Sequence, residues 1–250
     1  LAVAPLVGWR AVFIASSVTA AIALLVRSQL PESPLWAQKK REMLSPRQAW
    51  RVITKKHLIV PALKAWLLGV FKLVTYWTCY IWLPKFFQTE MHQPIGRSVL
   101  WILTAQSGQF LGMLVFGAIS DRAGRRLAFS AYSLLTAVPL YLLAFHWQQI
   151  IGVPPLFWAV MFVLGLGSGC TAGFGALLAE LFPTEVRNFA MGTTYNCARA
   201  IQIFAPVVVG YAAAAHGLTG ALCVPLVLAV ATGTWVWVLP ETRHRDLQCI

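Results

Sequence analysis

Long apolar stretches separated by polar gaps dominate the chain. Seven of them are long enough to cross a bilayer as helices, which requires roughly 20 mostly apolar residues. They cover residues 9–30, 58–83, 98–120, 127–145, 154–178, 189–215 and 218–239. Most gaps are short, which predicts that consecutive helices run antiparallel. The exception is the segment 31–57, which is long and basic and is expected to contain short surface helices.

The composition supports a membrane location. Hydrophobic residues make up 58% of the chain and charged residues only 11%, whereas a soluble domain carries about 25% charged residues. So few polar side chains could not cover a water-soluble core of this size. A bilayer solvates apolar helix faces directly, so the pattern predicts an all-α integral membrane protein.

Positive charge is unevenly distributed between the two ends of the predicted helices. The formal net charge is +12, but the basic residues occupy gaps between apolar runs, unlike the basic surface of a nucleic-acid-binding protein. Fourteen of the twenty Lys and Arg residues fall on the side of segment 31–57, whereas the opposite side holds Arg10, Lys85 and Arg97. The remaining three, Lys64, Lys72 and Arg199, lie within the predicted helices. The positive-inside rule places the richer side in the cytoplasm. We therefore expect a multi-pass protein of the plasma (inner) membrane, with its N-terminus outside, its C-terminus cytoplasmic and no nucleic-acid partner.

The gap after the third apolar stretch contains a recognisable motif. Residues 117–126 read Gly-Ala-Ile-Ser-Asp-Arg-Ala-Gly-Arg-Arg. Gly124 permits a tight turn, and Asp121 can accept charge-assisted hydrogen bonds from arginines or from a helix N-terminus. Such a latch can hold two parts of a protein together in one state and release them in another. The alternative is a basic turn that only orients the chain.

This loop resembles the G-x-x-x-D-R-x-G-R-R/K loop of the major facilitator superfamily, which lies on the cytoplasmic side between the second and third helices of each six-helix half. The segments 8–10, 31–36, 180–187 and 239–242 also resemble segments of that family. The resemblance implies a cytoplasmic gating role for residues in and near the loop. These residues are Gly117, Asp121, Arg122, Gly124, Arg125, Arg126, Glu180 and Arg187.

The resemblance covers essentially the whole chain and implies its domain organisation. Residues 1–30 would form the last helix of an N-terminal bundle, and residues 31–57 a basic cytoplasmic linker. Residues 58–250 would form a complete C-terminal six-helix transmembrane bundle, so that the chain carries family helices six to twelve. Because the chain begins at Leu1 within apolar sequence, we expect the intact protein to contain a further N-terminal half.

Two departures indicate which branch of the family is most similar. Sugar porters carry Q-Q-x-S-G in helix seven and a G-P-x-x-W-like stretch in helix ten, and this chain has neither. Its Trp-Leu-Pro at 82–84 and Tyr-Asn-x-x-Arg at 195–199 resemble members that carry organic acids with protons, such as the aromatic-acid and sialic-acid symporters.

A candidate substrate site follows from polar residues inside the predicted helices. Lys72 and Arg199 lie near mid-membrane, where a charge is costly and normally has a task. Residues at helical spacing share the faces of these two cations, and two glutamines lie on the eighth family helix. The candidate substrate-binding residues are Lys72, Thr75, Tyr76, Tyr80, Gln106, Gln109, Tyr195, Asn196, Arg199 and Gln202. Two cations, several amides and three tyrosines suit a carboxylate with polar or aromatic groups.

Structural roles remain open for the same residues. Arg199 and Lys72 can each pair with an acidic residue of a missing half, and Lys72 can also extend toward the membrane surface. The tyrosines can serve ordinary helix packing, and Gln106 and Gln109 can bond a neighbouring helix. All eight acidic residues lie in loops, tails or helix ends. A proton-carrying carboxylate is therefore expected in the missing half.

Together these observations predict secondary transport of a small organic anion by alternating access, with proton coupling. The expected partners are that substrate, protons, the lipid bilayer and the missing half. Two alternatives remain: transport of sugars or drugs by the same fold, and a membrane sensor that binds without transporting. The sequence contains no nucleophile–base pair, phosphate loop or metal-ligand cluster, so we expect no enzyme activity, no cofactor and no metal.

Overall fold

The computed structural model describes residues 4–29 and 44–243 of the 250-residue chain. It divides into two units, Leu1–Met43 and Leu44–Ile250, each described by itself below. The segment 31–36 and the rest of the expected linker up to residue 43 lie outside the described residues.

The described part of the first unit is the helix α1 (Ala4–Gln29). Its exposed apolar side chains include Ile14, Val18, Ile22 and Leu25, which recur every three or four residues. This spacing makes an apolar stripe that lipid or other helices must cover. The helix corresponds to the first predicted span.

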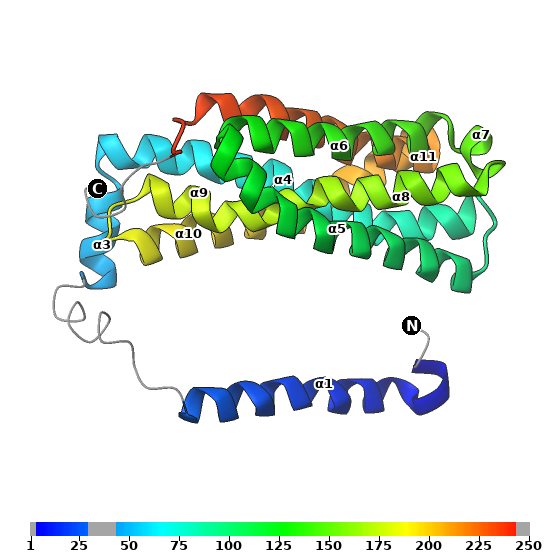
Figure 1. Ribbon diagram of the computed structural model, residues 1–250, viewed down its shortest axis with the longest axis horizontal. Coiled ribbons are helices and arrows are strands. Elements are labelled where there is room, and N and C mark those ends of the chain that lie inside the picture. The colour runs from blue at the N-terminus through cyan, green and yellow to red at the C-terminus, as the bar shows by residue number, and fades with distance from the viewer. Residues whose placement is uncertain (1–3, 30–43, 244–250) are drawn as a thin grey trace. The chain divides into compact units, whose positions relative to one another are not determined.

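The second unit is a bundle of helices that run along a common direction (Figure 1). In chain order, its first long helices are α4 (Lys56–Thr89), α5 (Ile95–Ala123), α6 (Arg125–Phe145) and α8 (Pro154–Ser168). The chain continues through η1 (Gly169–Ala172), α9 (Gly173–Leu181), α10 (Arg187–Ala200), η2 (Ile201–Phe204), α11 (Ala205–Trp235) and η3 (Val236–Val238).

Six segments of this unit are long and apolar enough to cross a membrane. They are His57–Thr89, Gly96–Ala123, Arg125–Phe145, Pro154–Leu181, Arg187–Gly217 and Thr219–Val238. The first five contain the spans predicted from residue 58 onward, and the sixth lies within the span predicted at 218–239. The prediction of an all-α membrane fold is therefore confirmed.

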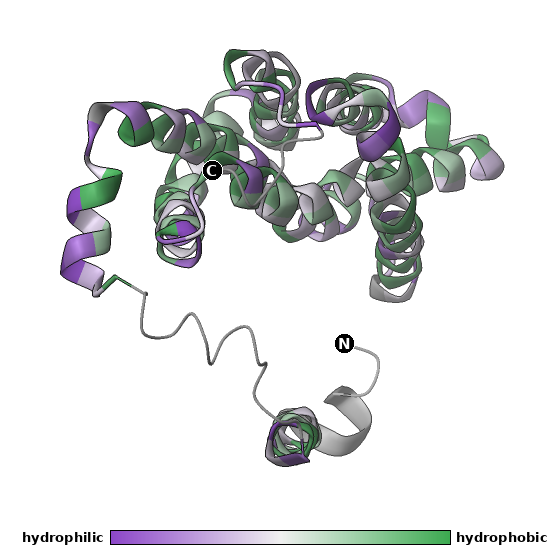
Figure 2. Ribbon diagram, turned by 60° about the vertical axis from the view of Figure 1, so that its left-hand side comes forward, coloured by the Kyte–Doolittle hydropathy of each residue, from purple (hydrophilic) through white to green (hydrophobic). Residues whose placement is uncertain are grey.

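A short helix lies at each end of the bundle: α3 (Pro46–Ile53) crosses one end and α7 (Trp147–Ile151) lies at the other (Figure 1). Ser45 explains where α3 begins, because it forms a capping box with Gln48 and Pro46 follows it at the first turn. The face of α3 toward the bundle buries Ala49 and Ile53. Figure 2 shows hydrophilic residues on α3, whereas apolar residues cover most of the long helices. The expectation of a short surface helix within residues 31–57 is confirmed for α3.

Two of the spans are not continuous α-helices. The span expected at 154–178 tightens into the 3-10 segment η1, and the next span tightens into η2 directly after α10. The last two spans meet at His216 and Gly217, where Gly217 has a φ of +67° and the chain turns back. A 3-10 stretch inside a long helix is a common place for bending.

The helices α5 and α8 approach each other closely, and glycine permits that approach. A Cβ at Gly165 would overlap the carbonyl oxygen of Ala105, and one at Gly112 would overlap that of Leu166. The backbones of the two helices therefore touch without intervening side chains, as small residues allow in membrane bundles.

Two aromatic-rich clusters fill the interior, one toward each end. The first includes Phe116, Phe129, Phe174 and Phe182 and extends to α3. The second lies toward α7 and includes Phe86, Phe87, Trp101 and Phe157. Polar side chains are buried between these clusters, and several of the candidate site residues are among them.

Candidate functional site

A layer of buried polar side chains separates the two aromatic clusters. On α4, Lys72 and Thr75 follow Leu68 of the first cluster and precede Leu83 of the second. The same position between clusters on α5, α6 and α8 is occupied by Gln109, Thr136 and Ser168. Since all four helices belong to membrane-length spans, this layer lies near mid-membrane.

Lys72 is the cation of this layer. Its residue is only 3% exposed, and it lies about 24 Å along α4 from Lys56 at 1.5 Å per residue. Within the described part of the chain its ammonium group has no hydrogen-bond or ion-pair partner. The hydroxyl of Thr75, one turn further along α4, donates to the carbonyl of Phe71 at 2.7 Å. A buried charge without a partner is unfavourable, so a ligand or another segment would be needed to neutralise it.

The tyrosines of the Lys72 face connect α4 to α5. The hydroxyl of Tyr76 donates to Oε1 of Gln109 at 3.4 Å, and the Tyr76 and Tyr80 rings lie with centroids 4.7 Å apart. The hydroxyl of Tyr80 is buried and lies close to Ser168. Gln106, one turn before Gln109, is exposed on α5. The two glutamines therefore differ in accessibility.

The candidate residues of the α10 span are mostly accessible. Asn196 and Arg199 are exposed, whereas Tyr195 and Gln202 are half-buried. Asn196 uses its amide to donate to the carbonyl of Gly192 at 2.8 Å, and Nε2 of Gln202 is buried without a partner among the described residues. Tyr195 packs against the first aromatic cluster, with its ring edge toward Phe174.

The candidate set therefore separates into an interior group and an accessible group. Lys72, Thr75 and Gln109 are buried inside the unit, whereas Gln106, Asn196 and Arg199 point away from its interior. Among the described residues, no hydrogen bond or ion pair joins the α4 group to the α10 group. Whether these residues bind one ligand stays a prediction.

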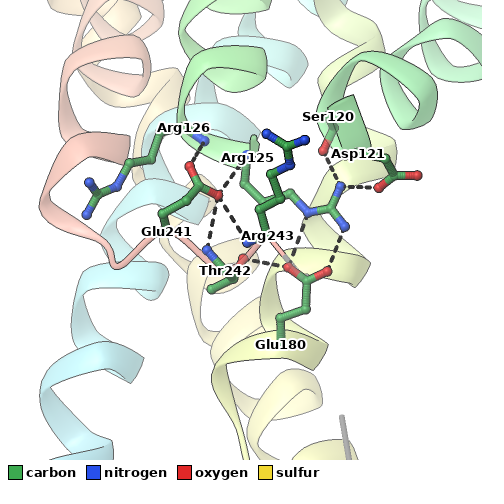
Figure 3. Close-up of polar contacts among 8 residues, drawn as sticks. All are labelled: Ser120, Asp121, Arg125, Arg126, Glu180, Glu241, Thr242 and Arg243. Carbon is green, nitrogen blue, oxygen red and sulfur yellow. Dashed lines mark hydrogen bonds and ion pairs between the residues drawn. The ribbon is translucent and has the colours of Figure 1, made fainter. Parts of the chain in front are cut away.

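The second candidate set forms a polar network at the α3 end of the bundle (Figure 3). Arg125 donates from Nη2 to Oε1 of Glu180 at 2.7 Å and from Nε to Oε2 at 3.2 Å, so the pair is bidentate. Its Nη1 donates to Asp121 at 2.6 Å and also to the hydroxyl of Ser120. The side chains of Arg125 and Glu180 are each 12% exposed, whereas that of Asp121 is 68% exposed. Glu180 is thus the inner partner and Asp121 the outer one.

Glu241 completes the network, although the sequence analysis did not single it out as a functional residue. Its carboxylate accepts backbone N–H groups of Arg125 at 2.9 Å and Arg126 at 3.2 Å. Because those groups open α6, Glu241 caps this helix from the far end of the chain. Thr242, the next residue, donates its hydroxyl to Glu180. The Leu-Pro-Glu-Thr segment at 239–242, which resembles a segment of the family, is the sequence signal that points to Glu241.

The charge of Glu241 is stabilised by the backbone. Its partial burial would raise the pKa, but N–H groups of Arg125, Arg126, Arg243 and Thr242 donate to it and hold its pKa below the ordinary value. Glu241 is therefore ionised at neutral pH. The turn beside it is made by Gly124, whose φ of +95° favours glycine, as the sequence predicted.

The other residues of the predicted gating set take different positions. Arg126 donates to the carbonyl of Leu239 through two guanidinium nitrogens. Arg187 donates from Nε to the carbonyl of Phe182 at 3.2 Å. Arg122 is exposed and, within the described residues, has no partner, and Gly117 is exposed with open space around its Cα. The structure therefore places Asp121, Gly124, Arg125, Arg126 and Glu180 in or beside one network, with Arg122 and Gly117 outside it.

Within the described residues, no three His, Cys, Asp or Glu side chains gather as metal ligands would. Two kinds of charged group are therefore available: Lys72 and Arg199 near the middle of two apolar spans, and a set of ion pairs at one end of the bundle.

Comparison with known proteins agrees with this arrangement. The family model described as Major Facilitator Superfamily matches residues 95–248. A putative metabolite transport protein of Haemophilus influenzae is 26% identical over 97% of this chain and 61% of its own length. A probable 4-methylmuconolactone transporter of Cupriavidus pinatubonensis is 28% identical over 94% of this chain and 54% of its own length. A cis,cis-muconate transport protein of Acinetobacter baylyi is 24% identical over 82% of this chain and 50% of its own length. The chain thus spans about half to three fifths of the length of these relatives.

Proposed function

The chain belongs to the major facilitator superfamily, and on this basis we propose that it is part of a secondary transporter that moves a small organic anion across a membrane by alternating access. Its six apolar spans make it an integral, multi-pass membrane protein. Membership of a family of transporters agrees with the expectation that the chain is not an enzyme.

The observation that carries the proposal is the position of Arg199. It lies about 18 Å along its span from Arg187, near the middle of a 31-residue segment. It is exposed, and it has no hydrogen-bond or ion-pair partner among the described residues. The Arg187–Gly217 span is also the least buried of the six. Only 11% of its most apolar stretch is buried, against 33–61% in the other five spans. An arginine facing lipid at mid-membrane is costly, so this face requires a polar cavity or a further part of the protein.

A cavity between two halves satisfies this requirement. The six-helix unit would supply Arg199, with Asn196 and Gln106, to a water-filled pathway against an N-terminal half that lies outside the 250 residues. An anionic substrate would then neutralise the guanidinium when bound. Lys72 would be a second cation, reached through the half-buried tyrosines of α4. Two cations without carboxylate partners favour an anion over a neutral sugar.

The network around Arg125 is proposed as the latch of the conformational cycle. Its bidentate bond to Glu180 and the bonds to Glu241 join the loop after α5, the end of α9 and the C-terminal segment. Breaking it would allow these three elements to move relative to one another. Since the energies of such charge-assisted bonds are a few kcal/mol, substrate binding can shift this equilibrium.

The names of the relatives support the substrate class. Proteins similar to this chain are described as transporters of metabolites, 4-methylmuconolactone and cis,cis-muconate. We extend this to small organic acids with unsaturated or aromatic skeletons. Proton coupling, a plasma (inner) membrane location, and the positive-inside orientation with a cytoplasmic C-terminus belong to the same proposal. So does the division into a last N-terminal helix at 1–30, a linker at 31–57 and a C-terminal bundle at 58–250.

Uptake into proteoliposomes tests the proposal. The protein is prepared with the sequence encoded upstream of Leu1 restored, and is offered labelled muconate, benzoate, a sugar acid and a neutral sugar, with and without an inward proton gradient. We expect saturable uptake of an acid that the gradient stimulates. Uptake of the neutral sugar alone would identify a sugar transporter, and saturable binding without flux would identify a sensor; either result contradicts organic-anion transport.

A further inference from the structure

A pocket of about 230 Å³ lies at the α7 end of the six-helix unit, opposite the Arg125 network. Its lining contains the guanidinium of Arg97, the amide of Gln93 and the aromatic side chains of Trp101, Phe157 and Trp158. None of the described residues that line it is acidic. The pocket therefore combines one cation with aromatic walls, and it lies at a different level of the bundle from Lys72 and Arg199.

The guanidinium is positioned by a side-chain amide. Gln93 donates from Nε2 to the carbonyl of Met91 at 3.0 Å, which fixes the orientation of the amide. Its Oε1 then accepts from Nη1 of Arg97 at 3.1 Å. Within the described residues, the other guanidinium N–H groups of Arg97 have no partner. They can therefore form the two parallel bonds that a carboxylate accepts from arginine.

The aromatic wall is rigid. Trp101 is buried, with its ring centroid 4.2 Å from that of Phe157 and 5.0 Å from that of Phe87. Both phenylalanines belong to the second aromatic cluster, so the indole of Trp101 is held in place. Trp158 lines the pocket from the first turns of α8 and remains partly accessible. A planar ring can therefore pack against a preformed aromatic surface at small entropic cost.

The backbone adds a favourable potential for an anion. Two long helices, α5 and α8, begin at this pocket, and neither has a side-chain cap at its N-terminus. Helix N-termini carry partial positive charge that favours anions. These helix ends add to the charge of Arg97, which remains the primary recognition group.

We propose that this pocket binds a small aromatic carboxylate, with the carboxylate on Arg97 and the ring against Trp101 and Trp158. The binding itself does not depend on transport. If the proposed transport is correct, the pocket captures the acid on the face of the membrane opposite the latch, before it reaches the cations at mid-membrane, and that role rests on the proposed function.

Binding of 4-fluorobenzoate to the purified 250-residue chain in detergent, followed by fluorine NMR, tests the proposal. We expect saturable binding that Arg97→Gln weakens about ten-fold, the size expected for loss of a charge-assisted bond. Trp158→Ala should weaken it as well, and neutral 4-fluorobenzamide should bind poorly. Lys85→Gln is the matched control, because it removes a positive charge from the same end of the bundle without lining the pocket.

Three results would overturn the proposal. The first is the absence of saturable binding. The second is an equal loss in Arg97→Gln and Lys85→Gln, which would indicate a general effect of charge. The third is a loss in Lys72→Gln but not in Arg97→Gln, which would place the ligand at mid-membrane and leave the transport proposal intact. Thermal unfolding of each variant shows that it is folded.

Discussion

Arg125 at the start of α6 is bound by both carboxylate oxygens of Glu180 on α9, 55 residues further along the chain. The same arginine also bonds Asp121, and its backbone N–H bonds Glu241. One residue therefore joins three segments that are distant in sequence. This makes Arg125 the most informative position for testing the latch.

Arg125→Gln is expected to destabilise the protein by about 2 kcal/mol, because it removes charge-assisted bonds and leaves a poorly exposed carboxylate at Glu180 unpaired. Unfolding in detergent with increasing SDS, followed by circular dichroism, measures the change. Arg122→Gln removes the same charge from an exposed neighbour and should have almost no effect. Equal effects of the two variants would show that the network contributes nothing specific.

Glu241→Gln is expected to cost about 0.5–1 kcal/mol at neutral pH, because it removes the negative charge that caps α6. The pKa of this carboxylate is lower in the folded state. Its contribution to the stability of the fold is therefore complete above the ordinary glutamate pKa of about 4.3. It is lost as the pH falls through the lower, folded-state value. SDS unfolding at a series of pH values from 7 downward should therefore show a difference between wild type and variant that is constant above the ordinary glutamate pKa and shrinks as the pH falls below it. A difference that persists in acid would contradict the charge-based cap.

Gly124→Ala is expected to destabilise the protein by about 1–2 kcal/mol. The residue has a φ of +95°, which L-residues adopt at a cost, and an added Cβ would lie 3.0 Å from a carboxylate oxygen of Glu241. Gly117→Ala is the matched control, because Gly117 lies inside α5 with nothing within 4 Å of the new Cβ. That variant should be neutral or slightly stabilising, since alanine is the better helix former. The melting temperatures of the two variants test this prediction: Gly124→Ala should unfold at a lower temperature than Gly117→Ala, and the reverse order would contradict it.

Lys72→Met is expected to raise stability by about 1 kcal/mol and to abolish uptake of the organic acid. The substitution replaces a buried ammonium that has no partner in the described residues with an apolar side chain of similar length. Opposite changes in melting temperature and in proteoliposome uptake are the signature of a residue kept for binding. A loss of both would instead indicate that Lys72 has a structural partner.

The sequence predicted the architecture well because membrane spans leave a strong and local signal. The six spans from residue 58 onward, the turn at Gly124 and the contact of Asp121 with a nearby arginine could all be inferred from neighbouring residues. The cap of α6 by Glu241 could not, since it joins positions 115 or more residues apart. Helical spacing also could not show that Lys72 is buried whereas Arg199 is exposed. Both residues lie near mid-membrane, and only the packing of the bundle distinguishes their surroundings.

Exchange of the transported acid across a liposome membrane tests the role of Arg199 most directly. Liposomes containing the protein together with the proposed N-terminal half are loaded with unlabelled acid, and the entry of labelled acid is followed without any proton gradient. We expect rapid exchange in wild type and in the control Lys85→Gln, and at least a ten-fold slower exchange in Arg199→Gln, because the anion loses a bidentate partner. Wild-type exchange in Arg199→Gln would contradict the claim that this arginine binds the substrate.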